Sequence, residues 1–374
     1  MRTDKPAPTA VSLFSGAGGM DVGVINAGFE VVLANDINPD ACATYRLNHG
    51  DMIVEGTILS LSNTFSHLKN IDLVFGGPPC QGFSVAGKMD PTDPRSGLMH
   101  SFFDAIDAIN PRAFICENVK ALAALSKWED TRLALMKRAS KNYLACLVVV
   151  NASHFGVPQN RERMFIIGIR KDQFSKSRAE FVDFVTDQLA LSKQTPETVG
   201  DIVQRLGPAG SQGNTRVCNA KITFCKSPVL RKSPFAGMLF NGAGRPIDAN
   251  GISSTLPASM GGNKTPIVDE EQIFSKASSY VKAYHTHLMR GKAPRKGNAP
   301  TRLRRLTVDE CLAIQTFPET YNLAGSRSSM YRQIGNAVPC KLAHVVANVV
   351  KSALNTADVN YNYDAPTLRV VGNS

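Results

Sequence analysis

The sequence contains no CxxC pair, no apolar run of membrane-spanning length and no internal repeat. Its eight cysteines are scattered, at positions 42, 80, 116, 146, 218, 225, 311 and 340. This usage is typical of reduced thiols in an intracellular protein and argues against a disulfide framework or a zinc site. The N-terminal stretch MRTDKPAPTA lacks the apolar core of a signal peptide. We therefore expect neither secretion nor membrane insertion.

Acidic residues are too few to balance the basic ones. The chain has 42 Lys and Arg against 31 Asp and Glu, a formal net charge of +11, and its pI is about 9.3. Such an excess suggests a polyanionic partner, although many basic proteins bind no nucleic acid. With 374 residues, 43% of them hydrophobic, the chain can form one large domain and a second, smaller one.

An α/β rhythm runs through the first half of the chain. Apolar segments predict strands at 11–14, 30–36, 71–77, 113–118, 144–153 and 164–170, and helical segments separate them at 20–29, 39–50, 101–110 and 128–140. The alternation predicts a doubly wound, mostly parallel sheet with helices on both faces. Ligands bind at the carboxyl ends of the strands in such folds, where Gly16, Asp36, Cys80 and Glu117 are expected.

The rhythm is lost after about residue 175. Residues 207–300 are rich in Gly, Pro, Ser and Lys and show no helical period longer than two turns. Apolar residues sufficient for a small core are present: Phe224, Leu230, Phe235, Leu239, Phe240 and Ile252. Helical order returns from residue 301. We therefore predict a catalytic domain at 1–200, an irregular domain at 201–300, and C-terminal helices at 301–374 that complete the catalytic domain.

A glycine-rich turn, FSGAGG (14–19), follows the first predicted strand and opens a helix. Backbone amides of such a turn can approach a ligand, and Asp36 after the second strand can accept from ribose hydroxyls. The spacing is not GxGxxG, which argues against a dinucleotide and favours an adenosine cofactor without a pyrophosphate. The alternative is an ordinary tight turn between strand and helix.

Cys80 follows two prolines in GGPPCQGFS (76–84), on a turn just past a strand. That placement favours a nucleophile, activated as the thiolate, over a buried inert thiol. Glu117 of the ENV triplet ends the next strand, where it lies beside Cys80 or is simply solvated. QNRER (159–163) enters a later strand, and alone it is typical of a charged strand edge.

Taken together, these motifs resemble those of DNA (cytosine-5)-methyltransferases over nearly the whole chain. FSGAGGMDVG resembles the cofactor loop of that family, GGPPCQGFS its catalytic loop, and ENV and QNRER its base-binding motifs. Two later stretches resemble its last motifs, RLRRLTVDECLAIQTFP (302–318) and QIGNAVP (333–339). The resemblance implies a Rossmann-like methyltransferase fold, and a restriction-modification or orphan enzyme that methylates C5 of a flipped-out cytosine in a specific duplex DNA sequence.

The resemblance also implies roles for individual residues. Cys80 would attack C6 of the cytosine and form a transient covalent adduct. Glu117 would bind the N3/N4 edge, Arg163 would hold O2, and Arg161 would help to order the site. Positions implied to contact DNA are Gln81, Ser84 and Arg95 after the nucleophile, Thr255 and Leu256 in the irregular domain, which becomes a target-recognition domain, and Arg295 and Lys296 at phosphates.

The cofactor implied is S-adenosylmethionine, which leaves as S-adenosylhomocysteine, with no metal. Its pocket would be formed by Phe14, Gly16, Gly18, Gly19, Asp36, Ile37, Thr57, Pro78, Asn336 and Val338. Phe14 would stack near the adenine and Asp36 would take the ribose hydroxyls. One position departs from the family, because a GTI triplet with Thr57 stands where an acidic residue often accepts from the adenine amino group.

The partner implied is double-stranded DNA, which the enzyme would bind as a monomer. The location implied is the bacterial cytoplasm, at the nucleoid, and a cognate restriction endonuclease could act separately. Further candidates for phosphate contacts are Arg290, Lys292, Arg302, Arg304 and Arg305, each of which could instead belong to a solvated charged strip. Two alternatives remain open, a transfer-RNA methyltransferase with the same core and a catalytically silent DNA-binding protein. The glycine spacing and ENV disfavour a dehydrogenase.

Overall fold

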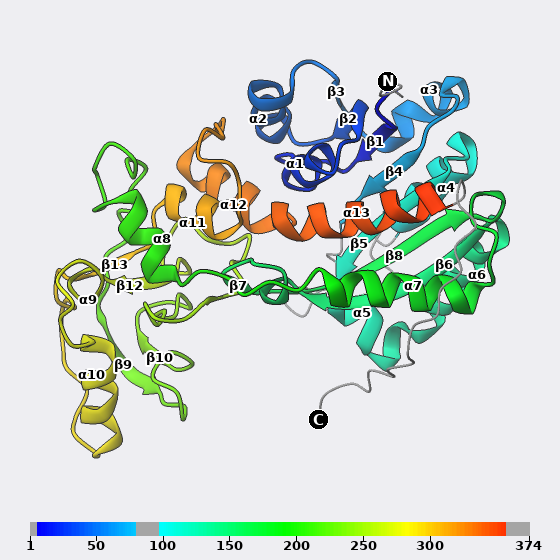
Figure 1. Ribbon diagram of the computed structural model, residues 1–374. Helices are drawn as coiled ribbons and strands as arrows, with labels where there is room; N and C mark the ends of the chain where they lie inside the picture. Colours follow the sequence, from blue (N-terminus) through cyan, green and yellow to red (C-terminus); the bar gives the residue numbers. More distant parts are fainter. Residues whose placement is uncertain (1–5, 80–96, 357–374) are drawn as a thin grey trace, which may run out of the picture.

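The computed structural model describes residues 6–79 and 97–356. It forms a large lobe built around one sheet and a smaller lobe of short elements (Figure 1). Four of the predicted site residues lie outside the described residues: Cys80, Gln81, Ser84 and Arg95.

The large lobe contains a seven-stranded sheet. Its strands, in spatial order, are β3 (Ile53–Glu55), β2 (Glu30–Asp36), β1 (Thr9–Leu13), β4 (Leu73–Gly76), β5 (Ala113–Val119), β8 (Glu162–Arg170) and β6 (Tyr143–Asn151). The pairs from β3 to β5 are parallel, and β8 is antiparallel to both of its neighbours. The predicted doubly wound, mostly parallel sheet is therefore confirmed.

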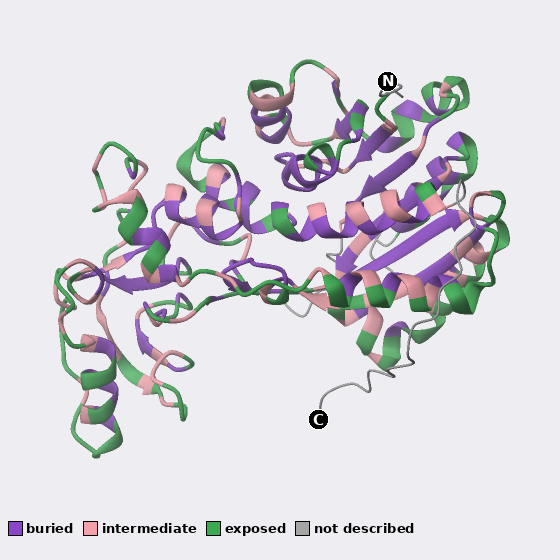
Figure 2. Ribbon diagram, in the orientation of Figure 1, coloured by how far each residue is buried: buried purple, intermediate pink, exposed green. Residues whose placement is uncertain are grey.

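Helices cover both faces of the sheet, because successive strand side chains point to opposite sides. Ala10 and Val11 of β1, for example, belong to two different apolar cores. The helices of one core are α1 (Gly19–Asn26), α2 (Pro39–His49), α7 (Arg178–Leu191) and α13 (Cys340–Thr356). Those of the other are α3 (Ser62–His67), α4 (Gly97–Ile109), α5 (Lys120–Ala124) and α6 (Glu129–Asn142). Figure 2 shows buried strands between helices whose outer faces are exposed.

Helix α7 follows the point at which the sequence pattern is lost, and the predicted elements did not include it. A local signal marks its start, since Ser177 and Glu180 form a reciprocal capping box at its first turn. A serine followed three residues later by a glutamate is a sequence signature of a helix N-terminus.

The smaller lobe consists of short helices and short strands. They are α8 (Val199–Leu206), β9 (Phe224–Val229), β10 (Met238–Phe240), β11 (Ser253–Ser254), β12 (Ile267–Asp269), α9 (Glu270–Phe274), α10 (Tyr280–Met289), β13 (Leu303–Arg305), α11 (Val308–Ile314) and α12 (Arg327–Asn336). Strands β12 and β13 pair antiparallel, so a ladder joins segments on both sides of residue 300. The division at residues 200 and 300 stays a prediction.

The core of this lobe differs from the predicted one at one position. Leu239 and Phe240 are buried, whereas Phe224, Leu230 and Phe235 pack partly buried against the same cluster. Ile252 does not belong to it, because 37% of its surface is exposed. The wrong choice arose because the composition of an irregular segment does not indicate which side of the chain faces inward.

Helix α10 corrects a second expectation, since its ten residues exceed the two turns predicted as the longest helical period. Its buried residues Val281, Tyr284, His285 and Leu288 follow the spacing of one helix face. Tyr284 packs edge-on against Phe224, with ring centroids 4.9 Å apart. The apolar stripe was hidden by the polar and histidine residues that share this face.

Three of the arginines proposed for phosphate contacts are bound internally, which corrects that assignment. Arg302 pairs with Asp269 at 2.7 Å and Arg304 with Glu310 at 2.7 Å, and these two arginine side chains are only 15% and 12% exposed. Arg305 is 1% exposed and donates to the carbonyl of Thr265 at 2.7 Å. Guanidinium groups that are largely covered and already held by internal partners are not available to DNA.

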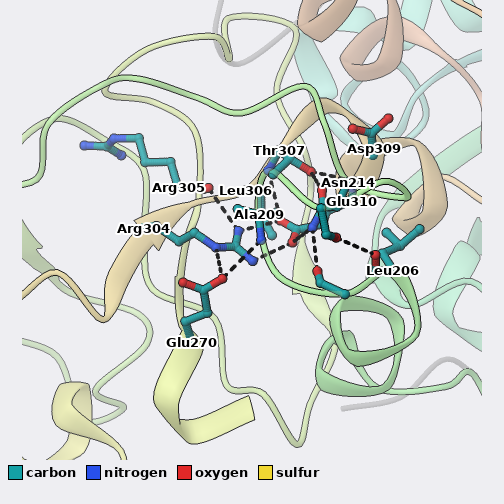
Figure 3. A network of polar contacts seen from close by, with 12 residues as sticks. Leu206, Ala209, Asn214, Glu270, Arg304, Arg305, Leu306, Thr307, Asp309 and Glu310 are labelled. Carbon is teal, nitrogen blue, oxygen red and sulfur yellow. Dashed lines mark hydrogen bonds and ion pairs between the residues drawn. The ribbon is translucent and has the colours of Figure 1, made fainter. Parts of the chain in front are cut away.

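Figure 3 shows the network around Arg304. Glu310 is fully buried and accepts from Arg304 at 2.7 Å and from Asn214 at 2.8 Å. The Thr307 amide also donates to Glu310, at 2.9 Å, in a capping box at the start of α11. Through Glu310, this network connects Asn214 in the loop after α8 to Arg304 on β13 and to α11. Removal of Arg304 or Glu310 would leave the other charge buried and uncompensated, which is strongly destabilising.

Candidate active site at the carboxyl ends of the strands

A largely buried ion pair lies where β5 and β8 run side by side. The Nε atom of Arg163 is 2.8 Å from Oε1 of Glu117, and the two side chains are 14% and 13% exposed. Burial raises the pKa of Glu117 above its ordinary value, and the nearby Arg163 and Arg161 charges oppose that rise. The site therefore holds a carboxyl group in a fixed orientation that retains a proton more readily than an exposed glutamate.

The chain leading to residue 80 leaves the sheet beside this pair. A Cβ atom at Gly77 would lie 2.8 Å from Oε2 of Glu117, so a larger residue there would displace this carboxylate from its present position. The side-chain amide of Asn118 donates to the carbonyl of Pro78 at 3.2 Å. Two of the predicted site motifs, GGPP and ENV, are thus joined at the ends of adjacent strands.

The glycine-rich turn after β1 is shaped by its neighbours. Gly16 and Gly18 adopt positive φ angles of 55° and 75°, which glycine tolerates. A Cβ atom at Gly18 would lie 2.7 Å from both His49 Nε2 and Tyr321 OH, so a side chain has no room there. The Asp36 carboxylate accepts from the Gly16 amide at 2.8 Å and so fixes the turn relative to β2.

The segment between α12 and α13 closes the turn from the other side. A Cβ atom at Gly19 would lie 2.8 Å from the carbonyl oxygen of Val338, and one at Gly23 would lie 2.6 Å from that of Cys340. Val338 is buried and Asn336 is exposed beside it in the chain. The structure thereby brings the two ends of the predicted cofactor pocket together, although they are more than 300 residues apart.

The remaining predicted cofactor residues lie along the same edge of the sheet. Phe14 follows β1 with φ of 56° and is partly buried, Ile37 follows β2 and is 65% exposed, and Thr57 is exposed in the turn after β3. The side-chain amide of Asn35 donates to the carbonyls of Val54 and Gly56, both at 3.0 Å, and so aligns the ends of β2 and β3. These side chains flank the Asp36 carboxylate, the predicted ribose contact, at the ends of three neighbouring strands.

Arg161 is placed at the junction between the lobes. It is 2% exposed, and its guanidinium donates to the carbonyls of Leu256, Gly335 and Ala337 at 3.0 to 3.2 Å. Close by, β7 (Gln159–Asn160) pairs with β11, and the Thr255 hydroxyl donates to the carbonyl of Asn160 at 2.8 Å. Thr255 and Leu256 are therefore tied to β7 and Arg161, which directly precede the strand that carries Arg163.

Arg295 and Lys296 are exposed in the smaller lobe, away from the sheet edge. Arg295 donates to the Tyr280 hydroxyl at 2.6 Å, and its guanidinium lies 5.6 Å from the centroid of that ring. The hydrogen bond and the cation–π contact together restrain the orientation of the guanidinium. The structure does not bring these two residues to the Glu117–Arg163 pair.

Sequence reasoning missed several residues that shape the site. His49 contacts Tyr321 at 2.9 Å, and the Tyr321 hydroxyl donates to the carbonyl of Ala17 at 2.6 Å. Burial lowers the pKa of His49 to about 4, so its imidazole is neutral at pH 7. These contacts join positions about 270 and 300 residues apart, for which one sequence carries no local signal. Two buried glutamines, Gln159 and Gln315, were also missed.

Within residues 6–79 and 97–356, no cluster of three or more His, Cys, Asp or Glu side chains could hold a metal ion. The same described part of the chain contains no helix that is both long and apolar enough to cross a membrane.

Comparisons with known proteins agree with these motifs. The family model of the C-5 cytosine-specific DNA methylases matches residues 9–352. The Type II methyltransferase M1.HphI of Haemophilus parahaemolyticus is 33% identical over 91% of this chain and 86% of its own, and M.NgoFVII of Neisseria gonorrhoeae is 30% identical over 95% and 88%. The crystal structure of S. pombe Dnmt2 methyltransferase shares the fold, with a TM-score of 0.62, 18% identity, and coverage of 94% of this chain and 100% of that one.

Proposed function

Because the chain belongs to the C-5 cytosine-specific DNA methylase family, and is thus a DNA (cytosine-5)-methyltransferase, we propose that it methylates a flipped-out cytosine in a specific duplex DNA sequence through an adduct with Cys80. The methyl donor proposed is S-adenosylmethionine, which supplies an electrophilic methyl group. The observation that carries the proposal is the largely buried Glu117–Arg163 pair beside the strand end that leads to residue 80.

The proposed chemistry starts from the weak nucleophilicity of cytosine C5. The Cys80 thiolate forms a bond to C6, the electrons of the C5–C6 double bond shift toward C5, and Glu117 delivers a proton to N3. The resulting enamine carbon C5 would take the methyl group as its bond to the sulfonium sulfur breaks, and S-adenosylhomocysteine would leave. Transfer of the C5 proton to water then re-forms the C5–C6 double bond as the thiolate leaves, and N3 returns its proton to Glu117. Arg163 holds O2 and keeps Glu117 in place.

Five of the other cysteines support the choice of Cys80. Burial raises the thiol pKa values of Cys42 and Cys146 to about 11 and those of Cys116, Cys311 and Cys340 well above the ordinary value. A thiol acts as a nucleophile only as the thiolate. Cys116, although next to Glu117 in sequence, points to the opposite face and contacts Met99.

The described residues fit an adenosine-containing cofactor. Asp36 uses its carboxylate oxygens for the amides of Gly16 and Asn38, both at 2.8 Å, and a carboxylate retains further lone pairs for ribose hydroxyls. The other pocket residues proposed are Phe14, Gly18, Gly19, Ile37, Thr57, Pro78, Asn336 and Val338.

Thr57 offers a test of the adenine contact. It precedes a short 3-10 turn, and its hydroxyl makes no capping hydrogen bond there. We expect Thr57→Val to weaken cofactor binding by about 1 kcal/mol, the usual value of a neutral hydrogen bond, and Thr57→Asp to preserve or strengthen it. Calorimetric titration with S-adenosylhomocysteine measures both. An unchanged affinity in the valine variant would mean that Thr57 does not contact the adenine.

We propose that residues 201–300 form the target-recognition domain and that double-stranded DNA binds between it and residues 1–200, completed by 301–374. Thr255 and Leu256 would contact the backbone of the flipped nucleotide, and Arg295 and Lys296 would contact phosphates. Gln81, Ser84 and Arg95 remain proposed DNA contacts. Support comes from the basic character of the smaller lobe, where residues 272–308 contain no acidic side chain.

A chimera tests this division. We expect an exchange of residues 201–300 for those of a relative with another specificity to give an enzyme that methylates the donor's site, because base edges are read by side chains of that segment. Bisulfite sequencing of DNA from cells that express the chimera identifies the site. A folded, active chimera that still methylates the original sequence would show that recognition lies elsewhere.

The proposed function itself is tested by transfer of tritium from labelled S-adenosylmethionine. We expect incorporation into duplex DNA, with bisulfite sequencing showing methylcytosine at one recurrent sequence. Incorporation into transfer RNA and not into DNA would replace the proposal by the RNA-modifying alternative. No incorporation into either, with DNA binding intact, would indicate a catalytically silent protein.

A further inference from the structure

Two fully buried glutamine side chains lie at the junction of the lobes. Gln159, at the start of β7, and Gln315, just after α11, are both 0% exposed. The side-chain amide nitrogen of Gln159 donates to Oε1 of Gln315 at 3.0 Å. They are 156 residues apart in sequence, and each also binds the backbone of a further segment.

Gln159 holds the segment from the smaller lobe. Its Oε1 atom accepts from the backbone amide of Leu256 at 2.9 Å. Ser253 and Ser254 pair with Gln159 and Asn160 in a short parallel ladder beside this contact. The backbone of residues 253–256, where the proposed contact to the flipped nucleotide lies, is therefore fastened at Gln159.

Gln315 holds the segment that closes the proposed cofactor pocket. Its Nε2 atom donates to the carbonyl of Ile334 at 2.6 Å and to that of Ala337 at 3.2 Å. The backbone carbonyl of Gln315 accepts from the backbone amide of Cys340 at 3.1 Å. Residues 334–340, which include Asn336 and Val338, are therefore fastened at Gln315.

The hydrogen bonds fix the direction of both amide groups. The Leu256 amide can only donate, so Gln159 must turn its oxygen toward it and its nitrogen toward Gln315. Gln315 must then accept from Gln159 and donate to the carbonyls of Ile334 and Ala337. The two held segments also touch directly, since a Cβ atom at Gly335 would lie 2.6 Å from the backbone of Pro257 and Ala258.

We propose that Gln159 and Gln315 are positioning residues that set the DNA-binding segment 253–258 and the cofactor-binding segment 334–340 at a fixed distance from each other. The inference rests on the proposed function, because it assigns one substrate to each segment. Each substrate binds with full affinity only when its segment is already held in place, because ordering a loose segment on binding costs free energy. The rigid amide link between the two binding segments supplies that order.

Gln159→Met and Gln315→Met test the proposal, because methionine keeps the approximate length of the side chain and removes its hydrogen bonds. We expect each variant to raise both the KM for a duplex carrying the methylated site and the Kd for S-adenosylhomocysteine about tenfold, equivalent to about 1.4 kcal/mol. Because either substitution breaks the same link, the double variant should be no worse than the more affected single variant. Both constants are independent of the fraction of active enzyme.

Gln333→Met is the matched control. Gln333 is also a buried glutamine, 6% exposed, but it accepts from Thr44 at 2.6 Å and donates to the carbonyl of Ala324 at 2.9 Å, with no hydrogen bond to residues 253–258. We expect this variant to lose thermal stability while both constants stay within about twofold of the wild type.

The outcomes separate the possibilities. Lower thermal stability in the Gln159 and Gln315 variants with both constants unchanged, as in the control, would overturn the positioning role. If the methionine variants do not fold, Gln159→Asn and Gln315→Asn shorten the side chain by one methylene and break the 3.0 Å contact, and the same two constants decide. Failure of the proposed function would differ, because the wild type would then not methylate the duplex.

Discussion

Glu117→Gln is expected to lower kcat for DNA methylation about 10²- to 10⁴-fold, the usual contribution of a positioned general acid. The amide has nearly the shape of the carboxyl group and can still bind the edge of the cytosine, but it cannot deliver a proton to N3. The variant should fold with some loss of stability, because the amide keeps the size of the carboxyl group and its oxygen can still accept from Arg163, although the ion pair is lost. Single-turnover kinetics with saturating duplex and cofactor measure the effect.

The pH dependence gives a second signature of Glu117. The acid form of a carboxyl group is present below its pKa, and burial raises this pKa, so the donor persists to higher pH than in an exposed glutamate. The wild-type rate should fall as the pH rises through the raised pKa of Glu117 and the carboxyl group loses its proton. Glu117→Gln should lack this dependence, whereas the increase due to formation of the Cys80 thiolate should remain.

Glu162→Gln is a matched control for the Glu117 substitution. Glu162 lies next to Arg163 on β8, but its side chain is 44% exposed and pairs with Lys120 at 2.8 Å. Exposed ion pairs contribute little to stability, so activity should remain near the wild-type value. Equal losses in both variants, or full activity in Glu117→Gln, would contradict the assignment of Glu117 as the proton donor.

Cys80→Ala is expected to abolish methylation while leaving affinity for duplex DNA largely intact. Without addition at C6, the C5 carbon stays too weak a nucleophile to accept the methyl group. Tritium transfer and an electrophoretic binding assay on the same preparation measure the two properties. The described thiols with raised pKa values cannot substitute as thiolates at neutral pH.

Cys146→Ala controls for loss of a thiol as such. Cys146 is 2% exposed within β6, and burial raises the pKa of its thiol to about 11. This variant should lose some stability and retain its turnover. Turnover by Cys80→Ala at a rate similar to that of Cys146→Ala would show that the reaction proceeds without Cys80.

The sheet and the order of its motifs could be predicted from the sequence because both depend on local patterns. Apolar runs such as IDLVF and AFICEN identify buried strands, and strand ends place Asp36 and Glu117 at one edge. Strand β3 was too short, at three residues, to give such a pattern. For helix α7, the capping box at its first turn is the sequence signal that indicates a helix.

The environment of a charged side chain could not be predicted in the same way. In the sequence, Arg302, Arg304 and Arg305 look like arginines of an exposed, phosphate-binding basic cluster. In the structure, partners from other segments hold all three side chains. Likewise, Arg161 and Arg163 stand two residues apart in one motif but have different partners. Arg161 binds backbone carbonyls from two distant segments, whereas Arg163 pairs with Glu117.

The central claim, covalent catalysis by Cys80 on a flipped cytosine, is tested most directly with a duplex that contains 5-fluorocytosine at the methylated position. Release of the enzyme requires removal of the C5 hydrogen as a proton, and fluorine at C5 cannot be removed in this way. The covalent adduct should therefore remain trapped when S-adenosylmethionine is present. We predict one protein–DNA complex that survives denaturation, with the DNA mapped by mass spectrometry to the peptide that contains Cys80. An enzyme that methylates normal duplex but forms no such complex, or forms it at another residue, would contradict the account.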